Sequence, residues 1–188
     1  MRWLNLLPAM AMMAASFATA EPKAEGNTNL FRLTTISLKD QFNQPHTFGF
    51  PQPGISILTV ADQKGSEQIE SWVRPLKARY PTGLTLEGVA DVSGVPAPLR
   101  PLIRRKFCDA FPHPLMLDWS GSVVKQLKPV RSLANVLVLN TNGIVLTRFQ
   151  GAAEATQLAR LFALLDAQLP RVVSTNAGPK KINEPPDL

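Results

Sequence analysis

Cys108 is the only cysteine among the 188 residues of this chain, and a thiol is the side chain best suited to nucleophilic or redox chemistry. It follows the basic run 104–106, with one residue between them, and nearby cations favour the reactive thiolate form. It also lies between Phe107 and Phe111, where a small thiol packs well and apolar surroundings disfavour the thiolate. A lone cysteine cannot form an internal disulfide, and the sequence has no CxxC pair. We therefore predict a structural role for Cys108, with a reactive thiol as the alternative.

Three aspartates, Asp62, Asp91 and Asp118, fall at the C-terminal ends of predicted strands. Ligand sites gather at that edge of an open α/β sheet, and carboxylates there could hold a cation. Aspartate is also a common strand-ending and helix-capping residue, which is the interpretation that we favour. Trp119 follows in a turn, where we expect it to be partly exposed, and with Asp91 and Asp118 it could shape a binding groove.

The two histidines do not indicate a metal centre. His46 and His113 are far apart in the sequence, and each adjoins a proline in a predicted turn. Neither belongs to a Cys/His spacing of the kind that binds zinc. We predict surface histidines, no metal site and no bound cofactor.

Residues 54–67 indicate a buried strand, a tight turn and the start of a helix. Residues 55–60 form a nearly continuous apolar run, as expected for a strand covered on both faces. The turn that follows is Asp62-Gln63-Lys64-Gly65-Ser66, and it contains no sulfur. Gly65-Ser66 is a plausible helix N-cap. The hydroxyl of Ser66 needs a base to become a nucleophile, and neither histidine is close in the sequence.

The rest of the chain predicts a mixed β-sheet with helices on its faces. Residues 36–48 alternate apolar and polar side chains around a turn at 43–45, which indicates a hairpin. A second hairpin is predicted around Asn142-Gly143. Further strands are predicted at 84–91, 114–118, 135–140 and 144–149, and helices at 66–80, 99–107, 122–127 and 152–169. Strands joined through helices, then a hairpin and a terminal helix, are typical of an α/β domain.

This order of elements resembles the thioredoxin fold in its redoxin branch, the peroxiredoxin-like and TlpA/ResA-like proteins. The resemblance covers residues 38–169, and three segments carry it. Residues 38–48 look like the N-terminal hairpin, residues 55–72 like the strand and helix that frame the active site, and residues 133–151 like the closing hairpin. The resemblance implies an α/β fold with a thioredoxin-like mixed central sheet, flanking helices and an N-terminal β-hairpin.

Two features that the family needs for catalysis are missing. The turn at 62–66 offers no thiolate to attack a disulfide or a peroxide. The family's cis-proline, which holds a substrate backbone beside the thiol, should fall near Ala134 and Asn135. A cis bond at a residue other than proline costs about 2.5–4 kcal/mol, so a trans bond is expected there. The resemblance thus implies a redox-inactive binding or accessory module. One alternative is a peroxidase or reductase working through Cys108, and another is a metal or small-molecule carrier at the sheet edge.

The two ends of the chain differ in character from this domain. Arg2, the apolar run 4–17 and the small residues at 18–20 are typical of a signal peptide cleaved after Ala20. We predict a flexible leader at 21–34, a domain at 35–169, a disordered tail at 170–188, and a periplasmic or otherwise exported location. The formal charge of +6 is mostly scattered, which does not favour nucleic acid as a partner. We expect the partner to be another envelope protein or a small ligand, with no transmembrane segment after signal cleavage.

Overall fold

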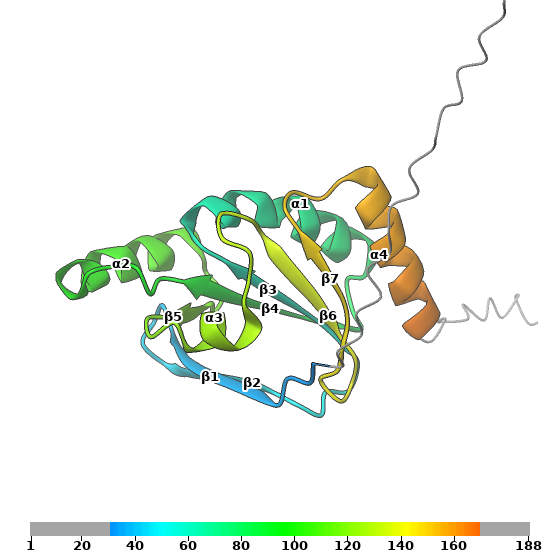
Figure 1. Cartoon of the computed structure of the whole chain (residues 1–188), viewed down its shortest axis with the longest axis horizontal. Coiled ribbons are helices and arrows are strands. Elements are labelled where there is room, and N and C mark those ends of the chain that lie inside the picture. Colours follow the sequence, from blue (N-terminus) through cyan, green and yellow to red (C-terminus); the bar gives the residue numbers. More distant parts are fainter. Residues whose placement is uncertain (1–30, 170–188) are drawn as a thin grey trace, which may run out of the picture.

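The computed structural model describes residues 31–169, which form one α/β domain around a single seven-stranded sheet (Figure 1). The strands are β1 (Thr35–Asp40), β2 (Pro45–Gly49), β3 (Ile55–Ala61), β4 (Leu84–Asp91), β5 (Met116–Asp118), β6 (Asn135–Leu139) and β7 (Val145–Gln150). The helices are α1 (Gln63–Arg79), the 3-10 helix η1 (Ala97–Leu99), α2 (Arg100–Ala110), α3 (Ser122–Leu127) and α4 (Ala155–Gln168). The predicted fold class is confirmed.

The centre of the sheet is parallel and its two sides are antiparallel. The strand order is β2-β1-β5-β4-β3-β6-β7, in which β3, β4 and β5 run parallel to one another. Ala61 is paired with Ala90, and Asp91 with Asp118. The C-terminal ends of these three strands therefore meet at one edge of the sheet, and the chain enters a turn or helix from each of them.

Both faces of the sheet are covered, which explains the continuous apolar run in β3. Leu58 and Val60 pack on the face that carries α3, whereas Ile55 and Ile57 pack on the face that carries α1 and α4 (Figure 1). Trp72 of α1 is fully buried on that second face, as its helical position predicts. Successive side chains of a strand point to opposite faces, so an apolar residue at every position serves both layers.

The start of α1 differs from the prediction. The helix begins at Gln63 and not at Ser66, and its N-cap is Asp62, whose side chain accepts a hydrogen bond from the Gly65 N–H. The predicted cap Gly65-Ser66 lies inside the first turn of the helix. Aspartate and serine are both favoured caps, and a glycine between them reads as a helix breaker in the sequence. Here Gly65 is buried inside the helix, because a Cβ at this position would meet the backbone of the loop before β6.

The packed part of the chain extends further towards the N-terminus than the boundary predicted at residue 35. Leu33 is fully buried, and its N–H donates to the carbonyl oxygen of Gly143. Arg32 forms an isolated bridge with Ile144. Residues 31–34 therefore belong to the domain and not to the leader. The predicted signal peptide, the rest of the leader and the predicted tail lie outside the described residues.

The other boundaries agree with the sequence patterns to within a few residues. Strand β4 and helix α3 have the predicted limits, while α2 continues to Ala110 and α4 begins at Ala155. Gly143 has a φ of +80°, as the Asn-Gly turn between β6 and β7 requires. Within residues 31–169, no helix has the length and apolar character needed to cross a membrane.

Candidate functional site

The three aspartates lie side by side at the C-terminal edge of the parallel strands, and each binds local groups. Asp62 accepts from the N–H of Gly65 at 2.9 Å, and Asp91 accepts from the Ser93 N–H at 3.1 Å and its hydroxyl at 2.6 Å. Asp118 is fully buried and accepts from three N–H groups at the start of α3, at residues 122–124. Asp62 and Asp118 thus cap helices, and Asp91 holds the turn that follows β4. Within residues 31–169, no cluster of three or more His, Cys, Asp or Glu side chains could hold a metal ion.

The turn that would carry the thiol in a redoxin is occupied by the Asp62 carboxylate. Its second oxygen accepts from the N–H of Ser132 at 2.8 Å, so that one side chain joins the start of α1 to the loop before β6. Ser66 is exposed, and its hydroxyl donates to the carbonyl oxygen of Gln63 at 2.7 Å within the helix. No base within residues 31–169 contacts this hydroxyl, and the exposed Gln63 and Lys64 supply no thiolate.

The loop before β6 is held closely against α1. A Cβ on Gly65 would overlap the backbone carbonyl of Leu133, so only glycine fits at this point in the helix. Gln68 donates to the Ser132 carbonyl at 3.3 Å and accepts from the Ala134 N–H at 3.1 Å. The backbone groups that could align an extended substrate here are therefore bound to side chains of the chain itself.

The loop also lacks the backbone geometry of a cis-proline. The one cis peptide bond within residues 31–169 is Phe50–Pro51, so the bonds on both sides of Ala134 are trans, as expected. The Asn135 side chain accepts from the Val130 N–H at 2.8 Å and donates to the carbonyls of Val130 and Leu133, both at 2.9 Å. Asn135 thus fixes the loop from inside and offers nothing to a ligand.

The hydrogen bonds to Asp62 stabilise its charged form. Removal from water raises the pKa of the Asp62 carboxyl, but the N–H groups of Gly65, Ser132 and Lys64 and the positive charge of Arg131 outweigh it. The net pKa lies below its ordinary value. The carboxylate therefore remains ionised at neutral pH and acts as a fixed anion at the helix N-terminus, where the helix dipole also favours it.

Asp62→Asn is expected to lower the free energy of unfolding by about 1–2 kcal/mol at pH 7, since the amide presents an NH2 to one of the two backbone donors. A carboxyl whose folded-state pKa is lowered stabilises the fold fully above about pH 4 and loses this effect as pH falls through the folded-state pKa. The difference between the two proteins should be constant from pH 7 to 5 and shrink at pH 3. Urea unfolding at these three pH values measures it, and an undiminished difference at pH 3 would contradict the role given to the charge.

A pocket of about 570 Å³ lies next to this turn, between α1 and α2. Its base includes Ala61 and Ala90, a pair of small residues at the ends of β3 and β4. Apolar side chains of α2 and the following loop close one side, among them Ile103, Phe107 and Phe111. Five charged residues also line it: Asp62, Glu67, Glu70, Asp91 and Lys106. Sequence reasoning missed this pocket, although the two alanines at corresponding strand ends were a visible signal.

The groove predicted around Asp91, Asp118 and Trp119 takes a different form. Asp91 does line the pocket, but Asp118 is fully buried in the cap of α3 and Trp119 is half-buried beside α2. Neither of the last two lines it. The three side chains therefore do not form one surface.

Cys108 lies on another side of α2 from the pocket. The thiol is partly buried, and its Sγ donates to the backbone carbonyl of Gln41 at 3.2 Å. Phe107 and Phe111, its predicted neighbours, stack on each other with ring centroids 5.9 Å apart. Cys108 does not line the pocket between α1 and α2, so the lone thiol and the pocket are separate features.

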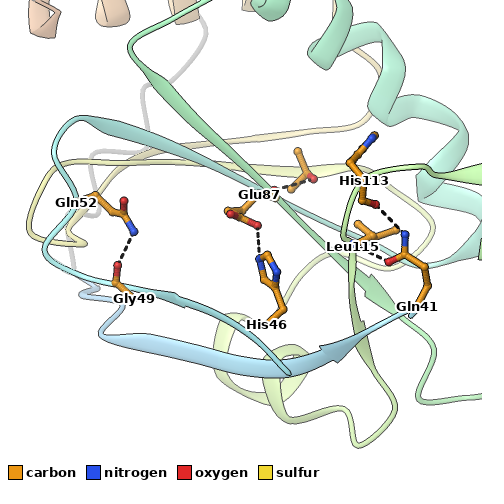
Figure 2. Close-up of polar contacts among 8 residues, drawn as sticks. Gln41, His46, Gly49, Gln52, Glu87, His113 and Leu115 are labelled. Atoms are coloured by element: carbon orange, nitrogen blue, oxygen red, sulfur yellow. Dashed lines mark hydrogen bonds and ion pairs between the residues drawn. The ribbon is translucent and has the colours of Figure 1, made fainter. Parts of the chain in front are cut away.

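Figure 2 shows polar contacts of His46 and Gln41 that the sequence did not reveal. His46 lies in β2 and not in a turn, and its Nε2 is 3.0 Å from a carboxylate oxygen of Glu87 in β4. The fully buried Gln41 donates to the carbonyl of His113 at 2.7 Å, as Figure 2 shows. It also donates to the carbonyl of Phe111 at 3.0 Å. Its amide oxygen accepts from the Leu115 N–H at 2.8 Å. Gln41 therefore fixes the segment between α2 and β5, which forms one wall of the pocket.

Several solved structures with a similar architecture carry the names of thiol-redox proteins. A candidate thiol:disulfide interchange protein DsbE from Chlorobium tepidum is 16% identical, with a TM-score of 0.57 over 73% of this chain and 96% of that one. The exposed lipoprotein thioredoxin Etrx1 from Streptococcus pneumoniae is 12% identical, with a TM-score of 0.55 over 70% and 100%. Peroxidoxin BcpB from Mycobacterium tuberculosis is 16% identical, with a TM-score of 0.53 over 73% and 96%.

No protein-family model matches the sequence, and no curated protein matches it. The structural similarity establishes the fold: this chain has the thioredoxin fold, and its structural neighbours are redoxin-type proteins. Within that fold, the chain has aspartate and glycine where the first turn of α1 meets the loop before β6.

Proposed function

We propose that this protein is an exported, redox-inactive binding module of the cell envelope, which takes a small apolar molecule into the pocket between α1 and α2. The observation that carries the proposal is the arrangement at the start of α1. Asp62, Gly65 and Gln68 join the helix to the loop before β6, while the pocket beside them remains open. The backbone groups at the start of α1 and in the loop before β6 are bound to each other's residues. The pocket between α1 and α2 is therefore the space beside this turn that can take a ligand.

The chemistry of the pocket favours an apolar ligand of modest size. Its volume of about 570 Å³ is within the range of small-molecule sites, which are lined mainly by apolar side chains with a few polar groups. Thiol chemistry finds no comparable support, since a thiolate at the helix N-terminus is required for it and Asp62 holds that position. Cys108 lies on α2 with its thiol bound to the Gln41 carbonyl.

Export is part of the same proposal. It is supported by the signal-peptide pattern of residues 1–20, and one structural neighbour is an exposed lipoprotein. Protein purified from an envelope fraction is expected to begin at Glu21, as N-terminal sequencing would show. An intact Met1 on cytoplasmic protein would contradict this part of the proposal.

The binding role is tested with a neutral apolar dye, Nile red, whose fluorescence rises in apolar sites. The mature protein should bind it saturably, and Ala90→Leu, which fills the base of the pocket, should weaken binding at least tenfold. Ala159→Leu places the same side chain on the exposed face of α4 and should leave binding unchanged. Equal binding by all three proteins would contradict the pocket assignment.

The redox part is tested on the same preparations. With excess dithiothreitol, the mature protein and its Cys108→Ser variant should both fail to accelerate insulin reduction or peroxide consumption above the background without protein. Turnover by the mature protein that Cys108→Ser abolishes would support the thiol-enzyme alternative and overturn the proposal.

A further inference from the structure

A cluster of two arginines and one tryptophan lies outside the pocket, where α2 packs near the end of β5. Arg100 and Arg104 are one helical turn apart on α2, and both guanidinium groups lie over the ring of Trp119. Their central carbons are 5.4 and 5.9 Å from the ring centroid. Trp119 directly follows β5, so the cluster lies at the C-terminal edge of the parallel strands, where α/β folds place ligands.

The buried donors of this cluster have no acceptors among the described residues. The Nε of Arg100, the Nε of Arg104 and the indole Nε1 of Trp119 are all buried, and none has a hydrogen-bond partner within residues 31–169. Ser56 Oγ in β3 is the one other buried side-chain atom of this kind in the described part of the chain. Buried donors without acceptors are rare because leaving them unpaired costs free energy. Three of them in one place indicate that an acceptor from outside the chain belongs there.

The positive charges of the cluster also lack ion-pair partners in the part of the chain that the structure describes. Neither arginine forms an ion pair with any residue in the range 31–169. The nearby strand-end carboxylates are engaged, since Asp91 binds Ser93 and Asp118 caps α3. Arg100 is moreover in the first turn of α2, which has no acidic residue and no side-chain cap. A cation is disfavoured at that end of a helix, and an anion is favoured.

We propose that Arg100, Arg104 and Trp119 bind a dianionic oxyanion, the phosphate group of free phosphate or of a small phosphate monoester. Such a group balances two positive charges. Its oxygens can accept from the terminal nitrogens of both guanidinium groups and, once the arginine side chains shift to admit it, from the three buried N–H donors. The planar guanidinium group matches phosphate oxygens in geometry and charge. The stacking on Trp119 holds both groups in place, so that little side-chain freedom is lost on binding.

Calorimetric titration with inorganic phosphate and with glycerol 3-phosphate, at about 150 mM sodium chloride, tests the site. The mature protein should bind at least one of them, and tighter binding of the ester would assign the source to a small phosphorylated molecule. Arg104→Gln and Arg100→Gln should each weaken binding about tenfold or more, as expected for a charged hydrogen bond. Arg105→Gln, an adjacent exposed arginine on the same helix, should change it less than twofold.

Two further measurements cover variants that fold poorly. Trp119→Phe keeps an aromatic ring under the arginines but removes the indole donor, so it should weaken phosphate binding while the melting temperature without phosphate changes little. Phosphate should also raise the melting temperature of the mature protein and of Arg105→Gln, but not of Arg104→Gln. Absence of binding by both anions, or equal binding by Arg104→Gln and Arg105→Gln, would overturn the proposal. Because Ala90→Leu alters only the apolar pocket, it should leave phosphate binding intact.

Discussion

Gly65→Ala is expected to lower the free energy of unfolding by about 2–3 kcal/mol. In an open helix position, alanine would be favoured over glycine by up to about 1 kcal/mol. At Gly65 the added Cβ overlaps the carbonyl group of Leu133, which is backbone and cannot rotate away. Overfilling a packed site of this kind costs about 1–3 kcal/mol or more, and the backbone obstacle places Gly65 at the upper end. The clash therefore outweighs the gain in helix propensity.

Urea unfolding of Gly65→Ala and of Gly94→Ala measures this effect against a matched control. A Cβ added to Gly94 would meet no atom within 4 Å, so this variant should change stability by less than about 0.5 kcal/mol. Equal stability of the two variants would mean that the loop before β6 can move away from α1. That result would remove the physical basis for a closed thiol site, because a mobile loop could admit a cysteine at position 65 and a substrate beside it.

The sequence was sufficient to predict the framework but not the way in which the turn is closed. The apolar run of β3 and the helical spacing around Trp72 follow from local periodicity, so the strand-turn-helix unit was predictable. The contacts of Asp62 with Ser132 and of Gly65 with Leu133 join residues far apart in the chain. Nothing in the pattern around residue 65 distinguishes a glycine that ends a helix from one that admits a neighbouring backbone.

The arginine cluster illustrates the same limit. Arg100 and Arg104 have the spacing of neighbours on one helix face, which the sequence does reveal. Their shared partner, Trp119, belongs to a different element, and the lack of acceptors is a property of the assembled fold. A basic stretch in a sequence is usually a solvated surface. Its burial against an aromatic ring is what makes it a candidate site.

Gln41→Leu is expected to destabilise the domain by about 3 kcal/mol. Leucine has a similar volume, so the change leaves little cavity, but it removes all three hydrogen bonds of the buried amide. Two carbonyl groups and the Leu115 N–H are then left without their partner, and each unsatisfied buried group costs about 1–3 kcal/mol unless water reaches it. Water can enter near the exposed His113, which keeps the total below the simple sum.

The control for this variant is Gln44→Leu, in the same β1–β2 turn but with an exposed side chain, which should be nearly neutral. Urea unfolding compares the two proteins, and amide hydrogen exchange at Leu115 reports the local effect, since its N–H loses its acceptor only in Gln41→Leu. Phe111 and Leu115 also line the pocket, so Gln41→Leu should weaken Nile red binding while Gln44→Leu does not. Wild-type stability and unchanged exchange in Gln41→Leu would show that the wall of the pocket is held by packing alone, because the hydrogen bonds from Gln41 would then contribute nothing to its position.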